Sequence, residues 1–263
     1  MTGVQTCALP IYATLEPLPE SPTACRHPHA PALPQPAVRL GLSSVRRLSG
    51  DAAQAIAAGR PYQDLEDLAR RVPLPAAALE ALATAGAFGC FGLTRREALW
   101  AAGAVARIRP GQLPGTTSGE TAPPLPAMTP IEETIADLWA TGTARIHPVA
   151  HLRAALDERG AVPAGSLKDV PGETNVIVAG LVTHRQRPGT AGGITFLNLE
   201  DETGMVNVIC RPQVWKRHQS IALRASGLLV HGRLERHDGA TNITATRLSR
   251  LPIAAAARSR DFR

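Results

Sequence analysis

Aromatic side chains are scarce in this chain and make up only 3% of its residues. Its cores must therefore be built from Leu, Val, Ile and Ala, which an apolar content of 44% can supply. No stretch approaches the ~18 to 20 consecutive apolar residues of a membrane-spanning helix, and the start lacks the charged and apolar regions of a signal peptide. These absences predict a soluble, cytoplasmic protein with no membrane partner.

The four cysteines stand far apart in the sequence. They form no Cys-x-x-Cys pair and no Cys and His spacing of a zinc site, which fits a reducing cytosol. His147 and His151 have a spacing that can bind zinc on a helix. However, Pro148 interrupts the first turn and no His-Glu-x-x-His order is present, so a helix-capping histidine is the better interpretation. We expect no metal or other cofactor in this chain.

Lysine is nearly absent, and arginine carries most of the positive charge. Arginine suits bidentate contacts to phosphate, but the codon bias of a GC-rich genome explains the same composition equally well. Residues 172–263 hold 13 Arg and Lys against 7 Asp and Glu, whereas residues 1–171 hold 15 of each. The net charge of +6 therefore lies entirely on the C-terminal segment, which predicts a polyanion as its partner.

Proline and glycine divide the chain into segments. The first eleven residues read like the translation of a sequencing-library adapter, which indicates an artefact joined to a truncated gene. The proline-rich stretch that follows is expected to be a loop or disordered, with regular structure beginning near Val38. We expect a lead over 1–37, a helical domain over 38–108, a linker over 109–128, a helical connector over 129–171, a barrel over 172–252 and a tail over 253–263.

The helical domain opens with the spacing of a helix-hairpin-helix motif. A short helix from Leu42 is followed by a tight turn at Ser49 and Gly50 and by a second helix. Glycine in such a turn lets backbone N–H groups at a helix N-terminus approach a DNA phosphate, and Arg46 and Arg47 add positive charge. An ordinary corner between two helices with an N-cap explains the same residues, and a single glycine favours that plainer interpretation.

Further helices are expected at 62–71, at 75–85 and, after the cap Thr94, from Arg95 to Arg107. Thr129 and Pro130 start another helix, whose early acidic residues are better explained by the helix dipole than by a metal site. The large apolar residues at helical spacing are expected in the core rather than in a site. They are Leu65, Leu68, Leu79, Leu82, Phe88, Leu99 and Trp100.

The C-terminal segment has the pattern of five strands. Two alternating runs surround an acidic turn that ends in Gly204, which predicts a hairpin, and a long strand precedes it from Asn175. A helix is expected at 214–225, followed by two strands at 227–236 and 241–250 joined by a turn at 238–239. Three strands, a helix and two strands are the order of the oligonucleotide-binding (OB) fold. The expected class is α+β with several domains: an all-α helix-hairpin-helix region followed by a five-stranded OB-fold barrel.

Alternation assigns the faces of this barrel. If Leu197 and Leu199 point inward, then Phe196 and Asn198 point outward, and Asn207 shares their face on the next strand. An exposed aromatic beside an amide, with Arg185, Arg187 and Arg211 expected on the rim of the face, can stack a base and hydrogen-bond its edge. The alternative is that Phe196 packs under a loop or against the helical domain. The candidate nucleic-acid site comprises Arg185, Arg187, Phe196, Asn198, Asn207 and Arg211 on the barrel, and Arg46, Arg47, Ser49 and Gly50 in the hairpin.

Several segments of this sequence closely resemble the C-terminal region of bacterial error-prone DNA polymerases. These enzymes belong to the C family, together with the polymerase III alpha subunit. The segments lie at 38–46, 95–103, 137–142, 182–188, 195–204 and 259–263. The resemblance runs from about Thr14 to the last residue. One departure is that the family's hairpin usually reads Gly-Leu-Gly, whereas this chain has Leu48, Ser49 and Gly50, which puts the grip on phosphate in doubt.

The resemblance implies a DNA-binding part of a translesion DNA-directed DNA polymerase. Family members extend a primer with palm-domain aspartates and Mg²⁺ behind an N-terminal PHP domain, and none of these segments is recognisable here, so the chain should not polymerise DNA by itself. Its hairpin would hold duplex and its barrel the single-stranded template. The implied partners are single-stranded DNA, primer-template duplex, the rest of the polymerase chain and other mutagenesis proteins. An alternative is an RNA-binding module, since the barrel also resembles the anticodon-binding domain of class II aminoacyl-tRNA synthetases.

Overall fold

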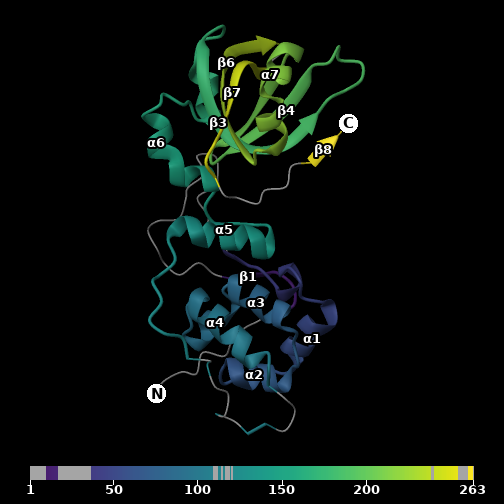
Figure 1. Cartoon of the computed structure of the whole chain (residues 1–263), viewed down its shortest axis with the longest axis vertical. Helices are drawn as coiled ribbons and strands as arrows, with labels where there is room; N and C mark the ends of the chain where they lie inside the picture. The colour runs from purple at the N-terminus through teal and green to yellow at the C-terminus, as the bar shows by residue number, and fades with distance from the viewer. Residues whose placement is uncertain are drawn as a thin grey trace. The chain divides into compact units, whose positions relative to one another are not determined.

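The computed structural model divides the chain into two compact units, which are drawn in Figure 1. It describes residues 10–16, 37–108, 112, 113, 115, 119, 121–237, 240–253 and 260–262. The first unit runs to Met128 and includes Ala140–Gly142. The second unit contains Thr129–Trp139 and everything from Thr143 onward.

The first unit combines a small sheet with short helices. Reciprocal capping starts its last helix, because the Thr94 hydroxyl accepts the Glu97 N–H at 3.3 Å and the Glu97 carboxylate accepts the Thr94 N–H at 2.7 Å. Gly86 has a left-handed φ of 75° and ends the preceding helix. The elements are β1 (Thr14–Glu16), β2 (Ala37–Arg39), the 3-10 helix η1 (Leu42–Ser44), α1 (Gly50–Ala58), α2 (Leu65–Arg71), α3 (Ala76–Thr84), the 3-10 helix η2 (Ala87–Phe91) and α4 (Arg95–Val105).

Two expectations for this unit are wrong. Thr14–Glu16, expected to be a loop, forms the edge strand β1 and pairs antiparallel with β2. Leu99 and Trp100, expected in the core, are 36% and 51% exposed, because α4 buries its alanines and Val105 instead. The other core predictions are confirmed, since the four leucines of α2 and α3 and Phe88 are all buried. Much of the expected lead and linker lies outside the described residues.

The second unit begins with a series of short helices. They are α5 (Pro130–Thr141), whose last two residues are grouped with the first unit, the 3-10 helix η3 (Pro148–Leu152), α6 (Arg153–Asp157) and the 3-10 helix η4 (Ala164–Asp169). Thr129 and Glu132 cap the start of α5 reciprocally, as their sequence predicts. His147 caps η3, because its Nδ1 accepts the N–H of Val149 at 3.2 Å, which confirms the capping interpretation.

The rest of the second unit is a closed barrel with the predicted element order. Its elements are β3 (Asn175–Gln186), β4 (Thr195–Asp201), β5 (Gly204–Cys210), α7 (Pro212–Arg224), β6 (Gly227–His237) and β7 (Ala240–Arg250). Strand β3 pairs with both β4 and β6, and β5 pairs in parallel with β7, so the five strands close on themselves. The turn expected at 238–239 lies outside the described residues.

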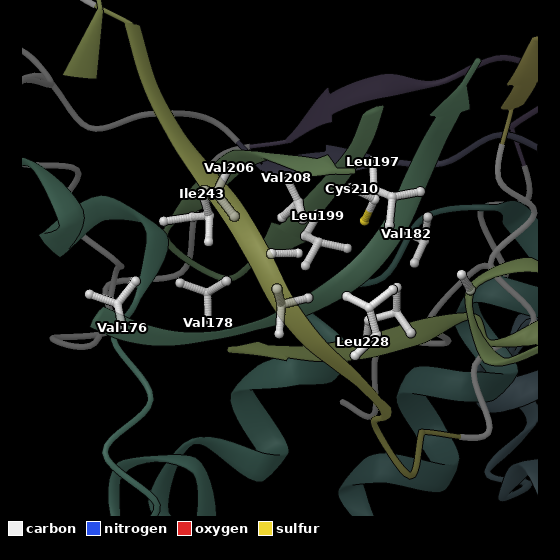
Figure 2. Close-up of a cluster of buried hydrophobic side chains, with 14 of the residues drawn as sticks. Val176, Val178, Val182, Leu197, Leu199, Val206, Val208, Cys210, Leu228 and Ile243 are labelled. Atoms are coloured by element: carbon white, nitrogen blue, oxygen red, sulfur yellow. The ribbon is translucent and has the colours of Figure 1, made fainter. Parts of the chain in front are cut away.

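Close backbone contacts allow β3 to pair on both sides. A side chain at Gly180 would place its Cβ 2.8 Å from the carbonyl oxygen of Glu200, so only glycine fits where β3 crosses β4. A register irregularity between Val182 and His184 follows. The interior is filled by aliphatic side chains from all five strands, which point toward one another in Figure 2. The scarcity of aromatics in the sequence is reflected directly in this core.

A second apolar cluster lies on the outside of the barrel. Val149 of η3 and Leu156 of α6 pack against Leu181 of β3 and Leu229 of β6. These outward positions are buried, which explains why the middle of β3 is buried on both faces rather than alternating. The preceding helices therefore cover the β3–β6 side of the barrel, and the outer faces of β4 and β5 are not part of this cluster.

The tail contains a strand that the sequence pattern does not predict. Strand β8 (Arg260–Phe262) pairs in parallel with the end of β3, with His184 opposite Arg260 and Gln186 opposite Phe262. It adds a sixth strand to the sheet beside β3. A three-residue strand is too short to give a periodic signal in the sequence.

Candidate nucleic-acid interface

The hairpin of β4 and β5 divides its side chains between two faces as alternation predicts. Leu197 and Leu199 are fully buried in the barrel, while Phe196 and Asn198 are partly exposed on the outer face. Strand β5 alternates in the same way, and Asn207 is exposed. The predicted faces and the predicted hairpin are therefore confirmed.

Three asparagines form a row across the outer face. Asn198 lies opposite Asn207 in the antiparallel pair β4–β5, and Asn207 lies opposite Asn242 in the parallel pair β5–β7. Side chains that are direct cross-strand neighbours stand about 5 Å apart, so the amides follow one another as a strip of donors and acceptors. Asn242 is not predicted from the sequence, because only the closure of the barrel brings β7 beside β5.

A row with apolar character runs next to the asparagines. Phe196 lies opposite Ile209, which in turn lies opposite Thr244, and on its other side Phe196 pairs with Gln186 of β3. Phe196 and Ile209 are both partly exposed. An aromatic face beside a strip of amides can stack a base and hydrogen-bond its edge. We call Phe196, Asn198, Asn207, Ile209 and Asn242 the β4–β5 face.

The acidic turn next to this face is used for structure. Asp201 is buried, and its carboxylate accepts the N–H groups of Thr203 at 2.8 Å and of Ala164 at 2.8 Å. Arg153 of α6 lies 3.4 Å from Asp201 and 2.5 Å from Glu202. The carboxylates thus fix the hairpin turn and attach the preceding helices to it, with Arg153 paired to both.

The prediction that Arg185 stands on the exposed rim is wrong. Its side chain is buried, with 8% exposure, and points to the end of α7. Its Nε donates to the carbonyl oxygen of Ala222 at 2.7 Å, and a terminal nitrogen donates to that of Ala225 at 2.6 Å. The last carbonyls of a helix have no intrahelical partner and carry partial negative charge, so a guanidinium stabilises them. Arg185 therefore holds α7 on the barrel.

Arg187 and Arg211 are exposed, as expected of rim residues. The loop between β3 and β4 brings them to one region. A Cβ atom at Gly193 would lie 3.4 Å from Pro212, which follows Arg211, and 3.8 Å from a guanidinium nitrogen of Arg187. Positive charge therefore borders the end of the β4–β5 face where α7 begins.

The hairpin segment exposes all four of its predicted residues, Arg46, Arg47, Ser49 and Gly50. Ser49 is the N-cap of α1, and its hydroxyl accepts the N–H of Ala52 at 3.2 Å. The left-handed residue of the turn is Arg47, with φ of 64°, rather than a glycine. A Cβ on Gly50 would meet nothing within 4 Å, so the start of α1 is open to an approaching group.

Two titratable groups of the second unit are perturbed by burial. Burial lowers the pKa of His147 below its usual range, although Glu200, Glu202 and Asp201 oppose the shift. Burial raises the pKa of the Cys210 thiol to about 12. Among the described residues, no group of His, Cys, Asp and Glu side chains is arranged to hold a metal ion. None of the described helices is long and apolar enough to cross a membrane.

Comparison with known families matches both units. A helix-hairpin-helix motif matches residues 19–98, and an OB-fold nucleic acid binding domain matches residues 176–251. The fold and the two matches define a nucleic-acid-binding chain of the α+β class, as predicted. The solved structure of asparaginyl-tRNA synthetase from Pyrococcus horikoshii is 20% identical over 36% of this chain and 24% of its own, with a TM-score of 0.31, and this likeness carries no argument on function.

Over most of its length the chain is similar to one part of proteins named error-prone DNA polymerase. It is 53% identical over 231 residues to the error-prone DNA polymerase of Mycolicibacterium paratuberculosis and 52% identical to that of Mycobacterium tuberculosis strain H37Rv. The enzyme of Nocardia farcinica is 50% identical over 239 residues. Each match covers 86% of this chain, but the chain spans only 21% of the length of these relatives.

Proposed function

We propose that this chain is a DNA-binding part of an error-prone DNA polymerase, and that its β4–β5 face binds the single-stranded template. The observation that carries the proposal is Phe196, partly exposed on a strand whose opposite face fills the barrel, beside the asparagine row. Bases of any sequence can stack on an aromatic ring, and a polymerase needs such tolerance in a template site. Arg187 and Arg211 would contact phosphates at the border of the face.

The hairpin segment would hold the duplex. Arg46, Arg47, Ser49 and Gly50 are exposed around the N-terminus of α1, where backbone N–H groups and the helix dipole favour a phosphate. Such contacts hold the DNA backbone in position without reading the base sequence. A template-directed enzyme needs this independence, because its product can have any sequence. The chain spans about a fifth of the length of its relatives. Polymerisation and contacts with protein partners would therefore belong to a complete polymerase, of which we propose that this chain is a part.

Substitution of Phe196 by alanine tests the template site. Loss of one stacked base costs about 1 to 3 kcal/mol, so the Kd for a fluorescent single-stranded oligodeoxynucleotide should rise roughly 5- to 150-fold. Trp100→Ala is the matched control, because Trp100 is an exposed aromatic of the helical unit that has no place in the proposed site. Fluorescence anisotropy measures both variants at one fixed salt concentration.

Two results would overturn this assignment. An unchanged Kd for Phe196→Ala together with a sharply lowered melting temperature would make Phe196 a core residue. Displacement of the oligodeoxynucleotide by transfer RNA at lower concentrations than by unlabelled single-stranded DNA would instead support the RNA-binding module. The 2′-hydroxyl groups allow a protein to distinguish the two nucleic acids, so this competition separates the two functions.

A further inference from the structure

Helix α7 has one apolar and one basic side. Trp215 and Ala222 point into the barrel core and are 6% and 0% exposed. Lys216, Arg217 and Arg224 are exposed on the other side of the helix. The helix thus covers one part of the barrel, and the charged side chains on its solvent side are all basic, since α7 contains no acidic residue.

The cations of α7 are joined by one from β7. Helix α7 packs against β7, which carries the exposed Arg247. Burial lowers the pKa of His218, and the nearby charges of Arg217 and Arg247 lower it further. We call Lys216, Arg217 and Arg247 the α7 basic surface.

Several other arginines of the second unit have protein partners. Arg153 pairs with acidic side chains, Arg233 lies 2.5 Å from Glu173, and Arg236 donates to three backbone carbonyls, including that of Val170 at 2.6 Å. Within the part of the chain that the structure describes, the cations of the α7 basic surface form no ion pair. The sequence around α7 offers no acidic partner, because no Asp or Glu occurs between Glu202 and Glu235.

The α7 basic surface is connected to the β4–β5 face through the start of the helix. Strand β5 ends at Cys210, one residue after Ile209, and Arg211 is the N-cap of α7. The contacts of Gly193 place Arg187 beside Pro212. The exposed cations of the loop and of the helix therefore continue from the edge of the β4–β5 face onto α7.

We propose that the α7 basic surface binds the phosphate backbone of the same DNA strand as it leaves the β4–β5 face. This inference rests on the proposed function and extends its site by several nucleotides. Cations without protein partners can take phosphates without breaking an internal ion pair. A strand that is long enough should gain affinity from these contacts, and the gain should depend strongly on salt because each phosphate contact releases counterions.

The test compares two oligodeoxythymidylates. Their lengths, roughly 4 and 16 nucleotides, are the two ends of the range of binding-site sizes of OB folds. We expect Lys216→Ala/Arg217→Ala to reduce the slope of log K against log salt for the longer strand by about 1.4, since each single-strand phosphate contact contributes about 0.7. Binding of the shorter strand should not change. The control is Arg145→Ala/Arg159→Ala, which removes the same charge from two exposed arginines outside both surfaces.

The outcomes separate this inference from the proposed function. If the unmodified chain does not bind the shorter strand, the proposed function fails and the inference fails with it. If the shorter strand binds but the α7 variant and the control behave alike with the longer strand, only the inference is overturned. Arg247→Ala repeats the test from β7, so the inference remains testable if the α7 variant does not fold.

Discussion

The most informative single substitution is Arg185→Ala, because a phosphate contact and a structural role for this residue predict opposite results. The structure gives Arg185 two short hydrogen bonds, at 2.7 and 2.6 Å, to carbonyl oxygens at the end of α7. Hydrogen bonds to a charged group contribute about 1.5 to 3 kcal/mol each, and truncation also leaves two carbonyls without a partner. The free energy saved by no longer burying a guanidinium offsets part of this loss, so we expect destabilisation of about 2 to 4 kcal/mol.

Thermal unfolding followed by circular dichroism measures this effect. A change of 1 kcal/mol shifts the melting temperature by about 2 to 4 °C in a protein of this size, so Arg185→Ala should melt roughly 4 to 16 °C lower. Arg187→Ala is the matched control: it is exposed two residues away and should lower DNA affinity with little change in melting temperature. Retained stability of Arg185→Ala, combined with weaker and less salt-dependent DNA binding, would refute the structural role and restore a phosphate contact.

Two further predictions follow from burial in the second unit. The pKa of about 12 leaves Cys210 almost wholly protonated at pH 8, so iodoacetamide should modify the peptide containing it only in denaturant, as measured by mass spectrometry; rapid labelling of the native chain would contradict its burial. The pKa of His147 is lowered on folding, so its contribution to stability should be complete above its unfolded pKa of about 6.5 and be lost as the pH falls through the folded value. An NMR titration midpoint of His147 at or above 6.5 would contradict this direction.

Local patterns in the sequence predict the β4–β5 hairpin correctly. Its two strands are joined by an acidic turn of fixed length, so the pairing of Phe196 with Ile209 and of Asn198 with Asn207 follows from counting along one hairpin. The capping histidine His147 and the caps of α4 are equally local. In each of these cases the interacting groups lie within one hairpin or one helical turn of each other in sequence.

Two of the differences between prediction and structure arise from contacts between distant segments. Arg185 meets carbonyl oxygens 37 and 40 residues away, and nothing near it in the sequence indicates that its charge is used inside the protein. Asn242 reaches the asparagine row only through the parallel pairing of β5 with β7. Trp100 is exposed because alanines supply the buried stripe of α4, whereas size and apolarity alone predict burial.

The central claim, that the β4–β5 face binds single-stranded DNA through Phe196, is tested most directly by photocrosslinking. An oligodeoxynucleotide carrying 5-bromodeoxyuridine is irradiated with the full chain, and the crosslinked peptide is identified by mass spectrometry. Because a bromouracil stacked on an aromatic ring lies in contact with it, we predict crosslinks within β4, at Phe196, that unlabelled single-stranded DNA suppresses. Crosslinks confined to the helices that cover the β3–β6 side, with none on β4 or β5, would contradict the claim.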